Sequence, residues 1–439
     1  MAQTVNESMH LEANDWLQEA TQPVCDRLTR LGRIRLASMY RKCFRSTWDT
    51  TLQWSDDSVF LITGDIPAMW LRDSSAQVYH YVPHAAKYPE VSRTILGLLR
   101  RHCQYIVLDP YTNAFNREGN GRHGYQDRTS WSEEQEKWIW ERKYEIDSLC
   151  YPIRLAHAFW KATGDTTWMD DLFMRAVQTI LFTWETEQHH GTRSPYYFER
   201  SDCPPSDTLP REGKGQIVGD TGMTWSGFRP SDDACQYGYL IPSNFFAVKS
   251  LEQMEEMIHV LAPDEALEKR IRVLREEILS GIEKYATVET ADFGRVYAYE
   301  VDGLGKFNLM DDANVPSLLS LPYLGCVDAK DETYRNTRRM VLSRKNPYYY
   351  EGTAARGIGS PHTPKDHVWP ISLCIQGLTS EDPEEIRALL DMLEHLDAGT
   401  GLMHEGVHVD DPARYTRDWF AWANSIFSEF VEKAVGYLH

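Results

Sequence analysis

An aspartate pair in one loop of the sequence has the features of a general acid. Asp232 and Asp233 directly follow a turn at Pro230, and Trp225 and Arg229 lie close by in the chain. Burial beside apolar groups and a neighbouring negative charge both raise the pKa of a carboxyl group, which lets it hold a proton at neutral pH. The pair also precedes a helical pattern, and aspartate is a common helix cap. We therefore expect one aspartate to cap the helix and the other to be free for chemistry.

A glutamate in a second loop has the features of a general base. Glu405 lies between His404 and His408 in a segment rich in glycine. The order His-Glu-x-x-His imitates a zinc protease motif, but that motif needs both histidines on one face of a helix. Glycines before it and a Val-Asp-Asp-Pro turn after it argue against a helix, so we predict no metal site. A glutamate in such a loop is suited to activate water as a base.

Two further loops combine aromatic, arginine and carboxylate side chains. Arg72 next to Asp73 can hold two vicinal sugar hydroxyls, because the guanidinium donates and the carboxylate accepts. The pattern is equally consistent with Asp73 as a helix cap and Arg72 in an ion pair. Trp138 and Trp140 precede a Glu-Arg-Lys string and offer stacking faces, although a buried ion-pair network uses the same residue types. Two distant carboxylates in aromatic loops fit glycoside hydrolysis, in which an acid protonates the departing oxygen and a base activates water.

The composition narrows the class of substrate. The 439 residues include 14 Trp, 23 Tyr and 15 Phe, and 65 Asp and Glu against 46 Lys and Arg give a net charge of −19. Such a charge repels nucleic acids and anionic membranes, so we expect neither as a partner. The sequence has no P-loop and no convincing dinucleotide-binding pattern, so we expect no cofactor. A neutral, hydroxyl-rich substrate fits best, because aromatic rings with polar edges can serve as sugar platforms as well as core fillers.

Helical periodicity dominates the chain. About a dozen amphipathic runs are separated by long loops, and only 58–63 and 296–300 have the pattern of short strands. No linker or repeat divides the sequence, so we expect one catalytic domain over residues 1–439. A dozen helices in one domain predict an all-α (α/α)6 toroid, a ring of helix pairs with a few short β-hairpins in its loops. The expected helical runs are 8–22, 26–46, 74–87, 90–107, 145–163, 167–186, 240–261, 264–286, 315–325, 332–344, 366–378, 382–396 and 415–436.

The N-terminal composition and the cysteines bear on location. The first residues lack the basic and apolar regions of a signal peptide, and no stretch is apolar enough to span a membrane. The eight cysteines are scattered singly, which is typical of reduced cysteines in an intracellular protein. We therefore expect a soluble, cytoplasmic protein.

Long strings of the sequence are similar to one known family, the exo-α-1,6-mannosidases of glycoside hydrolase family 125. The likeness runs from about residue 30 to the C-terminus. It implies an (α/α)6 barrel that inverts the anomeric configuration without a metal. The strings that carry it are GDIPAMWLRDSSAQ (64–77), WIWERKYEIDSLCYP (138–152), TGMTWSGFRPSDDACQYGYLIPSNFFAV (221–248), YAYEVDGLGKFNLMDDANVPSLLSLPYLG (297–325) and TGLMHEGVHVDDPARYTRDWFAWAN (400–424).

The resemblance also implies roles for individual residues. It places the general acid on Asp232 and the general base on Glu405. The string Trp-Leu-Arg-Asp-Ser is similar to one in the glucoamylase family, which implies that Arg72 and Asp73 grip the non-reducing mannose. Further candidate substrate contacts on matched loops are Trp70, Trp140, Arg142, Lys143, Asp147, Trp225, Arg229, Asp311, Asp312, His362 and His404.

The sequence thus predicts an inverting exo-α-1,6-mannosidase whose partner is a mannose-containing oligosaccharide. An α-glucoside hydrolase or phosphorylase on the same toroid is an alternative, because the sequence does not place the group that meets the axial O2 of mannose. A carbohydrate-binding protein without catalysis is another alternative, although both carboxylates are present. For Asp311 and Asp312, capping of a helix is an alternative to sugar contact.

Overall fold

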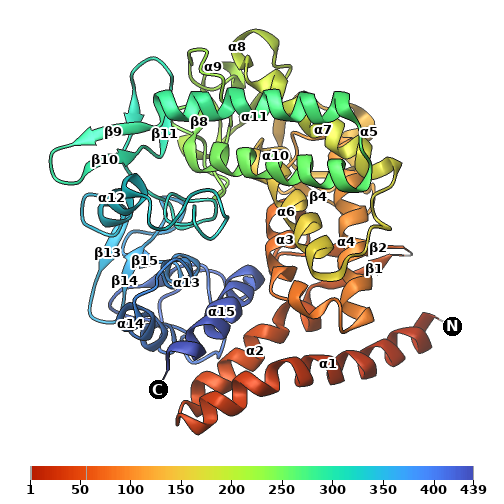
Figure 1. The fold of residues 1–439 in the computed structure, drawn as a ribbon, viewed down its shortest axis with the longest axis vertical. Coiled ribbons are helices and arrows are strands. Elements are labelled where there is room, and N and C mark those ends of the chain that lie inside the picture. The colour runs from red at the N-terminus through yellow and green to blue at the C-terminus, as the bar shows by residue number, and fades with distance from the viewer. Residues whose placement is uncertain (1, 56, 439) are drawn as a thin grey trace.

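The computed structural model describes residues 2–55 and 57–438, with side chains from residue 16 onward. These residues form fifteen α-helices and sixteen short strands. The longer helices form a ring, and the loops between them carry the strands (Figure 1).

Five helices line the inside of the ring. α3 packs against α6, α6 against α10, α13 against α15, and α15 against α3. Residues 317–325 lie between α10 and α13 and form a series of mostly buried turns (Figure 1). The bounds of the five helices are α3 (Leu71–Tyr79), α6 (Ile146–Thr163), α10 (Ile241–Leu261), α13 (Pro370–Leu378) and α15 (Ala421–Ala434).

Amphipathic helices cover the outside of this ring. α11 (Glu265–Tyr285) packs on α10 through a stripe of buried leucine and isoleucine side chains three or four residues apart. Asp264 caps it, because its carboxylate accepts two backbone N–H groups of the first turn at 3.0 Å. The other outer helices are α2 (Ile34–Thr50), α4 (Pro89–Leu108), α7 (Asp171–Glu187), α12 (Glu332–Val341) and α14 (Pro383–Leu393).

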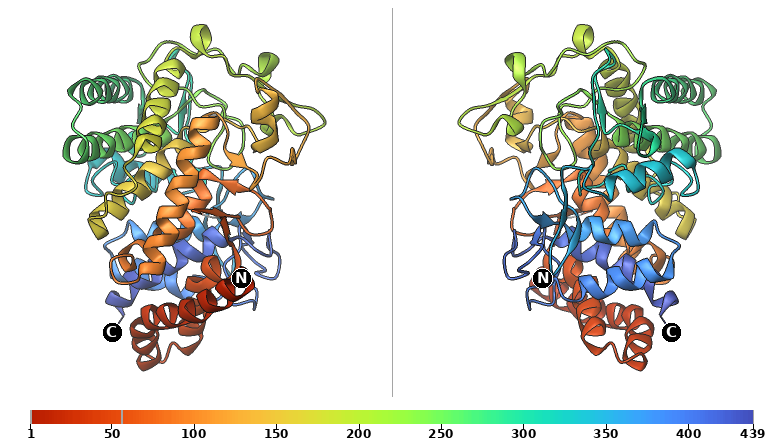
Figure 2. Two further views of the ribbon diagram at one scale, coloured as in Figure 1. Left: turned by 90° about the vertical axis from the view of Figure 1, so that its right-hand side faces the viewer. Right: turned by 90° about the vertical axis from the view of Figure 1, so that its left-hand side faces the viewer.

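The remaining helices lie at the ends of the molecule or in its loops. α1 (Ala2–Arg30) packs against α2 outside the ring. It lies at the opposite end of the molecule from the short helices α8 (His190–Arg193) and α9 (Pro210–Gly213), as Figures 1 and 2 show. α5 (Glu133–Trp138) belongs to the loop before α6.

The strands form seven small antiparallel sheets. Their position matters for the site, because β3, β6, β8 and β15 each end shortly before an inner helix begins. The sheets are β1 (Leu52–Ser55) with β2 (Ser58–Leu61); β3 (Met69–Trp70), β4 (Ala114–Phe115) and β6 (Ile139–Glu141); β5 (Asp127–Thr129) with β7 (Phe198–Arg200); β8 (Tyr239–Leu240), β11 (Glu300–Val301) and β12 (Phe307–Asn308); β9 (Thr287–Thr290) with β10 (Gly294–Tyr297); β13 (Tyr349–Glu351) with β14 (Arg356–Ile358); and β15 (His367–Val368) with β16 (Val407–His408).

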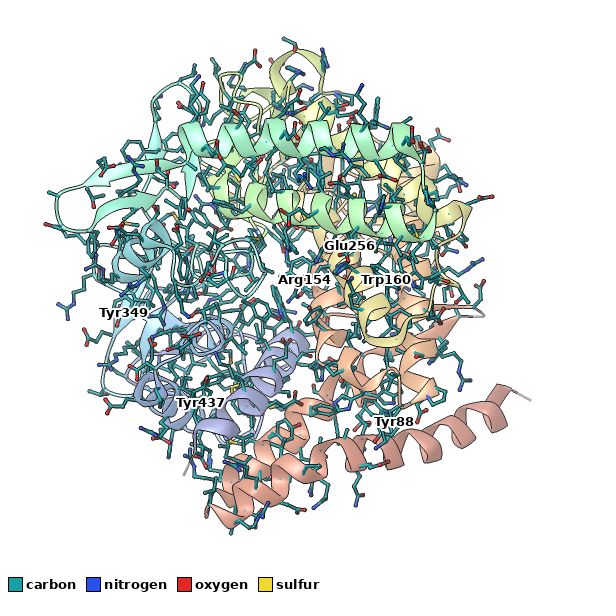
Figure 3. All side chains as sticks on the ribbon, in the orientation of Figure 1. Tyr88, Arg154, Trp160, Glu256, Tyr349 and Tyr437 are labelled. Atoms are coloured by element: carbon teal, nitrogen blue, oxygen red, sulfur yellow. The ribbon has the colours of Figure 1, made fainter. Side chains whose placement is uncertain are left out.

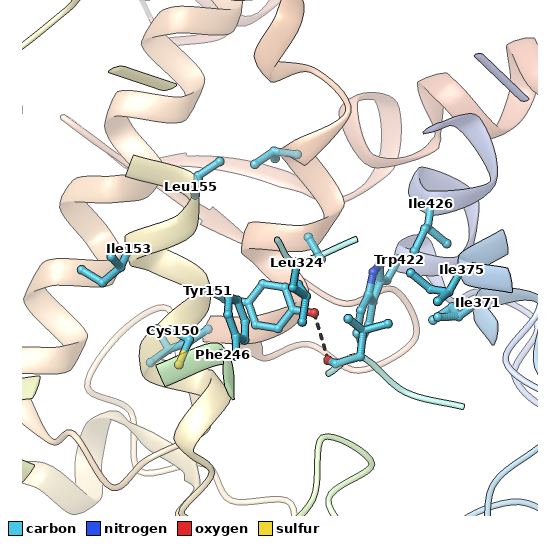
Figure 4. Close-up of a cluster of buried hydrophobic side chains, with 14 of the residues drawn as sticks. Cys150, Tyr151, Ile153, Leu155, Phe246, Leu324, Ile371, Ile375, Trp422 and Ile426 are labelled. Atoms are coloured by element: carbon cyan, nitrogen blue, oxygen red, sulfur yellow. Dashed lines mark hydrogen bonds between the residues drawn. The ribbon is translucent and has the colours of Figure 1, made fainter. Parts of the chain in front are cut away.

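Side chains fill the centre of the ring. Tyr151 of α6 packs edge-on against Phe246 of α10 and Trp422 of α15, with ring centroids 5.2 and 6.1 Å apart. Its hydroxyl donates to the backbone oxygen of Val315 at 2.9 Å (Figure 4). Arg154, on the same helix, is buried as well (Figure 3). The ring therefore encloses a packed core rather than a channel.

One predicted helix is wrong. Residues 315–325 form turns, although their leucines have helical spacing. Pro316 and Pro322 have no N–H group to donate to a helical hydrogen bond. Two other N–H groups of the segment donate instead to the carboxylate of Asp311, at 2.8 and 2.9 Å. The backbone donors that a helix needs are therefore missing or already used.

Other predicted helices are present with shifted starts. The run at 366–378 becomes strand β15 before the helix begins at Pro370, and the run at 415–436 begins its helix at Ala421. Strand β16 follows Glu405, so the His-Glu-x-x-His segment forms no helix, as predicted. The residues before the helices that begin at Pro370 and Ala421 form loops that reach the site described below.

Two further findings concern membranes and cysteines. Within the described part of the chain, each helix is too short or too polar to cross a membrane. All eight cysteines are free thiols, and six of them are buried.

Candidate active site

A cavity of about 290 Å³ lies where the loops before the inner helices meet. These loops come from five separate parts of the chain, and each precedes an inner helix or the turns at 317–325. The cavity brings together Asp232 and Glu405, the two predicted catalytic carboxylates. Its lining residues are Thr63, Ile66, Trp70, Arg72, Asp73, Pro230, Ser231, Asp232, Asn314, His362, Trp369, Glu405, Arg417 and Phe420.

A second cavity of about 580 Å³ adjoins the first. More of its lining residues are exposed, so we call it the outer cavity and the first the inner cavity. The two cavities share four lining residues, Ile66, Trp70, Asp232 and His362. The other lining residues of the outer cavity are Gly124, Tyr125, Trp140, Glu141, Lys143, Arg200, Pro204, Ser206, Asp207, Asp233 and Pro361.

Arg72 is the centre of a buried charge cluster under the inner cavity. Its guanidinium donates to Asp73 at 2.6 Å, Glu145 at 3.1 Å, Asp147 at 3.2 Å and Asp232 at 3.0 Å. The carboxylates of Asp73 and Asp147 lie in the first turns of α3 and α6, where the helix dipole favours negative charge. Burial nevertheless raises the pKa of Asp73, Glu145 and Asp147, the last to about 6, because one cation cannot replace the lost water.

Asp232 lies at the tip of a tight hairpin that holds it in a left-handed backbone conformation, with φ of 67°. Its Oδ1 accepts hydrogen bonds from Arg72 at 3.0 Å and from the amide of Asn113 at 3.2 Å. Lys143 donates to its backbone oxygen at 2.7 Å. Burial would raise the pKa of Asp232, but the positive charges of Arg72, Lys143 and His362 together with its neighbour Glu145 outweigh burial and lower the pKa. The strained backbone and the three donors therefore fix the position of Asp232, as is common for catalytic residues.

Asp233 does not cap a helix, and neither does Asp232, so the predicted cap is wrong. α10 begins only at Ile241 and has no side-chain cap. Asp233 instead pairs with Nδ1 of His362 at 3.0 Å. Burial lowers the pKa of His362, but this hydrogen bond and the nearby carboxylates outweigh burial and raise the pKa to about 9. His362 therefore carries a positive charge at neutral pH at the junction of the two cavities.

Glu405 is held by a hairpin that follows it. Its Oε2 accepts a hydrogen bond from the hydroxyl of Thr416 at 3.0 Å, and its Oε1 lies 3.6 Å from Nη1 of Arg417. Arg417 has a left-handed φ of 56° and also donates to Asp65 at 3.0 and 3.2 Å. The general-base candidate thus has one neutral donor and one cation beside it.

Three buried side-chain polar atoms on cavity residues have no hydrogen-bond partner among the described residues. They are Nε1 of Trp70, Oδ1 of Asn314 and Oδ2 of Asp233. Buried polar atoms are normally paired. Unpaired ones at a cavity wall suit a ligand that brings many hydroxyl groups.

Comparisons with known proteins decide the family. The sequence profile of the metal-independent α-mannosidases, glycoside hydrolase family 125, matches residues 34–432. The chain belongs to this family. The family, the enzyme class and the fold class predicted from the sequence are confirmed.

Two individual relatives also support the assignment of this chain to family 125. A Streptococcus pneumoniae metal-independent α-mannosidase, solved as a non-productive complex with α-1,6-mannobiose, has a TM-score of 0.93 and 45% identity. The match covers 96% of this chain and 98% of that one. The meiotically up-regulated gene 157 protein of Schizosaccharomyces pombe is 39% identical over an alignment of 417 positions, which covers 90% of this chain and 81% of that protein.

A more distant match concerns the fold alone. A bacterial glucoamylase complexed with acarbose has a TM-score of 0.51 at 13% identity, over 84% of this chain and 49% of that one. The family 125 chain therefore has the (α/α)6 toroid of such glycosidases.

Some predicted sugar contacts of this α-mannosidase do not line either cavity. Trp225 is 1% exposed, because its ring stacks on His190 with centroids 3.5 Å apart. Arg229 is buried in an ion pair with Glu300 at 2.6 Å. His404 is held below the cavity, with Nδ1 3.0 Å from the backbone oxygen of Arg417.

The predicted carboxylate contacts on the loop before residues 317–325 are also internal. Asp311 accepts backbone N–H groups, as its capping alternative predicted, although the segment forms turns. Burial raises the pKa of Asp311 to about 8. Asp312 accepts the hydroxyl of Ser231 at 3.1 Å and so supports the loop of the aspartate pair. Asp147 lies under Arg72 and supports its guanidinium.

Arg142 is a further internal residue, and its substitution tests that placement. It is 4% exposed and donates to both oxygens of Asp109, at 2.6 and 3.2 Å. Arg142→Met leaves a buried carboxylate without its cation, so we expect the free energy of unfolding to fall by about 3–5 kcal/mol in urea titrations. Arg128→Met is the matched control, because Arg128 is 67% exposed. It should cost less than about 1 kcal/mol. Wild-type stability with weakened sugar binding in Arg142→Met would make Arg142 a sugar contact instead.

Several residues of the site were not found from the sequence. Arg417 and Asn314 line the inner cavity, and Glu145 accepts a hydrogen bond from Arg72 beneath it. No local sequence pattern distinguishes these three residues. Their roles depend on segments far apart in the chain that meet only in the ring.

Proposed function

We propose that this chain removes terminal α-1,6-linked mannose from the non-reducing end of oligosaccharides, with inversion at the anomeric carbon. The linkage is inferred from the family 125 relative that binds α-1,6-mannobiose. The observation that carries the proposal is the inner cavity, where Asp232, Glu405 and the Arg72–Asp73 pair surround one space. Exo-action fits a small inner cavity that opens into a larger outer one.

We assign the role of general acid to Asp232 and that of general base to Glu405. Asp232 lines both cavities, so it borders the point where a bond between an inner and an outer sugar would lie. It gives its proton to the leaving oxygen as the bond from the anomeric carbon breaks. Glu405 lines the inner cavity alone and takes a proton from the water that attacks the anomeric carbon.

The remaining cavity residues bind the two sugar units. Arg72 and Asp73 offer a donor and an acceptor for vicinal hydroxyls of the inner mannose, and Trp70 and Asn314 add unpaired polar atoms. In the outer cavity, Trp140, Lys143 and His362 line the space for the leaving-group sugar. The family is metal-independent, and we propose no cofactor.

The anomer formed first tests the mechanism. Proton NMR of α-1,6-mannobiose hydrolysis should show β-mannose before mutarotation, because single displacement inverts the α-linkage. α-Mannose as the first product would show retention and contradict the proposal. Mannose 1-phosphate formed in phosphate buffer would show a phosphorylase, and cleavage of α-glucosides but not of mannosides would show a glucosidase. Sugar binding without turnover of any glycoside would show a non-catalytic protein.

We also propose that the chain forms one catalytic domain in a reducing compartment. One contiguous hydrophobic cluster extends from Trp16 to Leu438, which supports a single domain. The eight free thiols support a cytoplasmic location.

A further inference from the structure

One buried carboxyl group beside the site has no role in the mechanism proposed above. Glu145 is fully buried and lines neither cavity. Nη2 of Arg72 donates to both of its oxygens at 3.1 Å and to Oδ1 of Asp232 at 3.0 Å, so the two carboxyl groups share a donor. The shared donor thus brings the two carboxyl groups within reach of a direct hydrogen bond. Such a bond requires a proton on one of them, because an ionised carboxylate only accepts.

The surrounding charges favour keeping that proton. Arg72 serves four carboxylates at once, so a fully ionised cluster would carry an excess of buried negative charge. Burial raises the pKa of Glu145 well above its ordinary value, whereas Arg72 lowers that of Asp232. Before a glycoside binds, the proton therefore rests on Glu145. Charged and titratable groups face Glu145 and Asp232 from every side. They are Arg72 and Asp73 of α3, Lys143 and Asp147 around the start of α6, Cys235 two residues after Asp233, and His362 of the loop before α13.

This arrangement leaves the proposed acid ionised until something protonates it. We infer that Glu145 stores the catalytic proton and, when a glycoside fills the cavities, passes it to Asp232 across a hydrogen bond formed beside their shared donor. The inference rests on the proposed function. A bound sugar displaces water from Asp232, whose side chain is 24% exposed, and its bridging oxygen accepts a hydrogen bond only from the protonated form. Both effects favour the proton on Asp232.

The proton balance closes over one turnover. Asp232 gives the proton to the leaving oxygen, which keeps the electron pair of the broken bond. Water attacks the anomeric carbon and loses a proton to Glu405. Solvent then returns one proton to the pair through Asp232, and Glu405 releases one. Glu145 touches no reacting atom in this scheme, so it is a positioning residue that acts through Asp232.

Glu145→Gln tests the inference through the pH profile. Glutamine can still accept from Arg72 and donate to Asp232, but it holds no transferable proton. Asp232 then stays ionised down to lower pH, so the alkaline limb of kcat/KM for α-1,6-mannobiose should move down by about one pH unit or more. At pH 7 we therefore expect a loss of about 10-fold or more. An α-mannoside with a dinitrophenyl leaving group needs no acid and should be cleaved at near the wild-type rate.

Ser148→Ala should move the same limb in the opposite direction. The hydroxyl of Ser148 donates to Oε2 of Glu145 at 2.8 Å and so stabilises its ionised form. Its removal raises the pKa of Glu145, and the pair should keep its proton to higher pH. This milder variant also serves if Glu145→Gln fails to fold.

Asp147→Asn is the matched control, because it removes another carboxylate from Arg72 at 3.2 Å without a hydrogen bond to Asp232. It should shift the limb by less than half as much as Glu145→Gln. An unmoved limb in Glu145→Gln, an equal shift in both variants, or an acidic shift in Ser148→Ala would overturn the inference. If the wild type cleaves no mannoside, the proposed function itself is wrong, and that outcome is distinguishable from the three results that contradict only the role of Glu145.

Discussion

Replacing Asp232 with asparagine is expected to lower kcat/KM for α-1,6-mannobiose by about 10²- to 10⁴-fold. The sugar leaving group is a poor one, so its oxygen must gain a proton as the bond breaks, and an amide has no such proton to give. The substitution keeps the shape of the side chain and an oxygen that can accept from Arg72 and Asn113, which now donate at 3.0 and 3.2 Å. Steady-state hydrolysis, followed by release of mannose, measures the loss.

Two comparisons separate loss of the acid from loss of the fold. An α-mannoside with a dinitrophenyl leaving group should be hydrolysed by Asp232→Asn almost as fast as by the wild type, because that group departs unprotonated. Asp233→Asn is the matched control, since the neighbouring carboxylate pairs with His362 and lines only the outer cavity. If Asp233→Asn loses the greater part of activity and Asp232→Asn does not, the assignment of the acid is reversed.

The ring was predictable because its outer helices carry their information locally. α11 shows this most clearly, since its apolar stripe is visible in the sequence and is buried in the structure. The turns at 317–325 show the limit of the same reasoning. Their leucines repeat with helical spacing, but the fate of their N–H groups depends on Asp311, and only the folded chain shows that contact.

The site was predictable where a loop combines unusual residue types. Asp232, Glu405 and the Arg72–Asp73 pair all line the inner cavity. Trp225 was misjudged for a physical reason, because a tryptophan between polar residues can be a platform or a core residue. Its indole ring fits against Gly238, where even a Cβ atom would lie 2.2 Å from the ring. That close approach makes it a core residue.

Residues that act through other residues were the hardest to predict. Arg417 reaches Glu405 because the hairpin after that residue folds back on it, and Glu145 reaches Asp232 through Arg72. Arg72 lies 73 residues before Glu145 in the chain, so no local pattern in the sequence joins them. A family resemblance can assign a role to a residue that matches a motif. The protonation state of that residue, however, depends on all the charged groups around it in the folded chain.

Replacing Glu405 with glutamine is expected to lower kcat for α-1,6-mannobiose by about 10²- to 10⁴-fold, because glutamine cannot take a proton from the attacking water. Binding should change much less, since Arg72 and Asp73 remain in place. The side chain can still accept from Thr416, which now donates at 3.0 Å, so thermal unfolding should stay close to wild type.

Azide tests whether the lost function is that of a base. The azide anion attacks without losing a proton, and it can occupy the space beside Arg417, whose Nη1 lies 3.6 Å from the carboxylate in the wild type. With the dinitrophenyl mannoside, azide should therefore restore turnover of Glu405→Gln and form β-mannosyl azide, the product of attack from the face opposite the leaving group. Asp418→Asn is the control on the same hairpin, because that exposed carboxylate bonds only Tyr415 among the described residues and should behave as the wild type. Formation of α-mannosyl azide would place the nucleophile on the other face of the sugar and exclude Glu405 as the base of an inverting displacement.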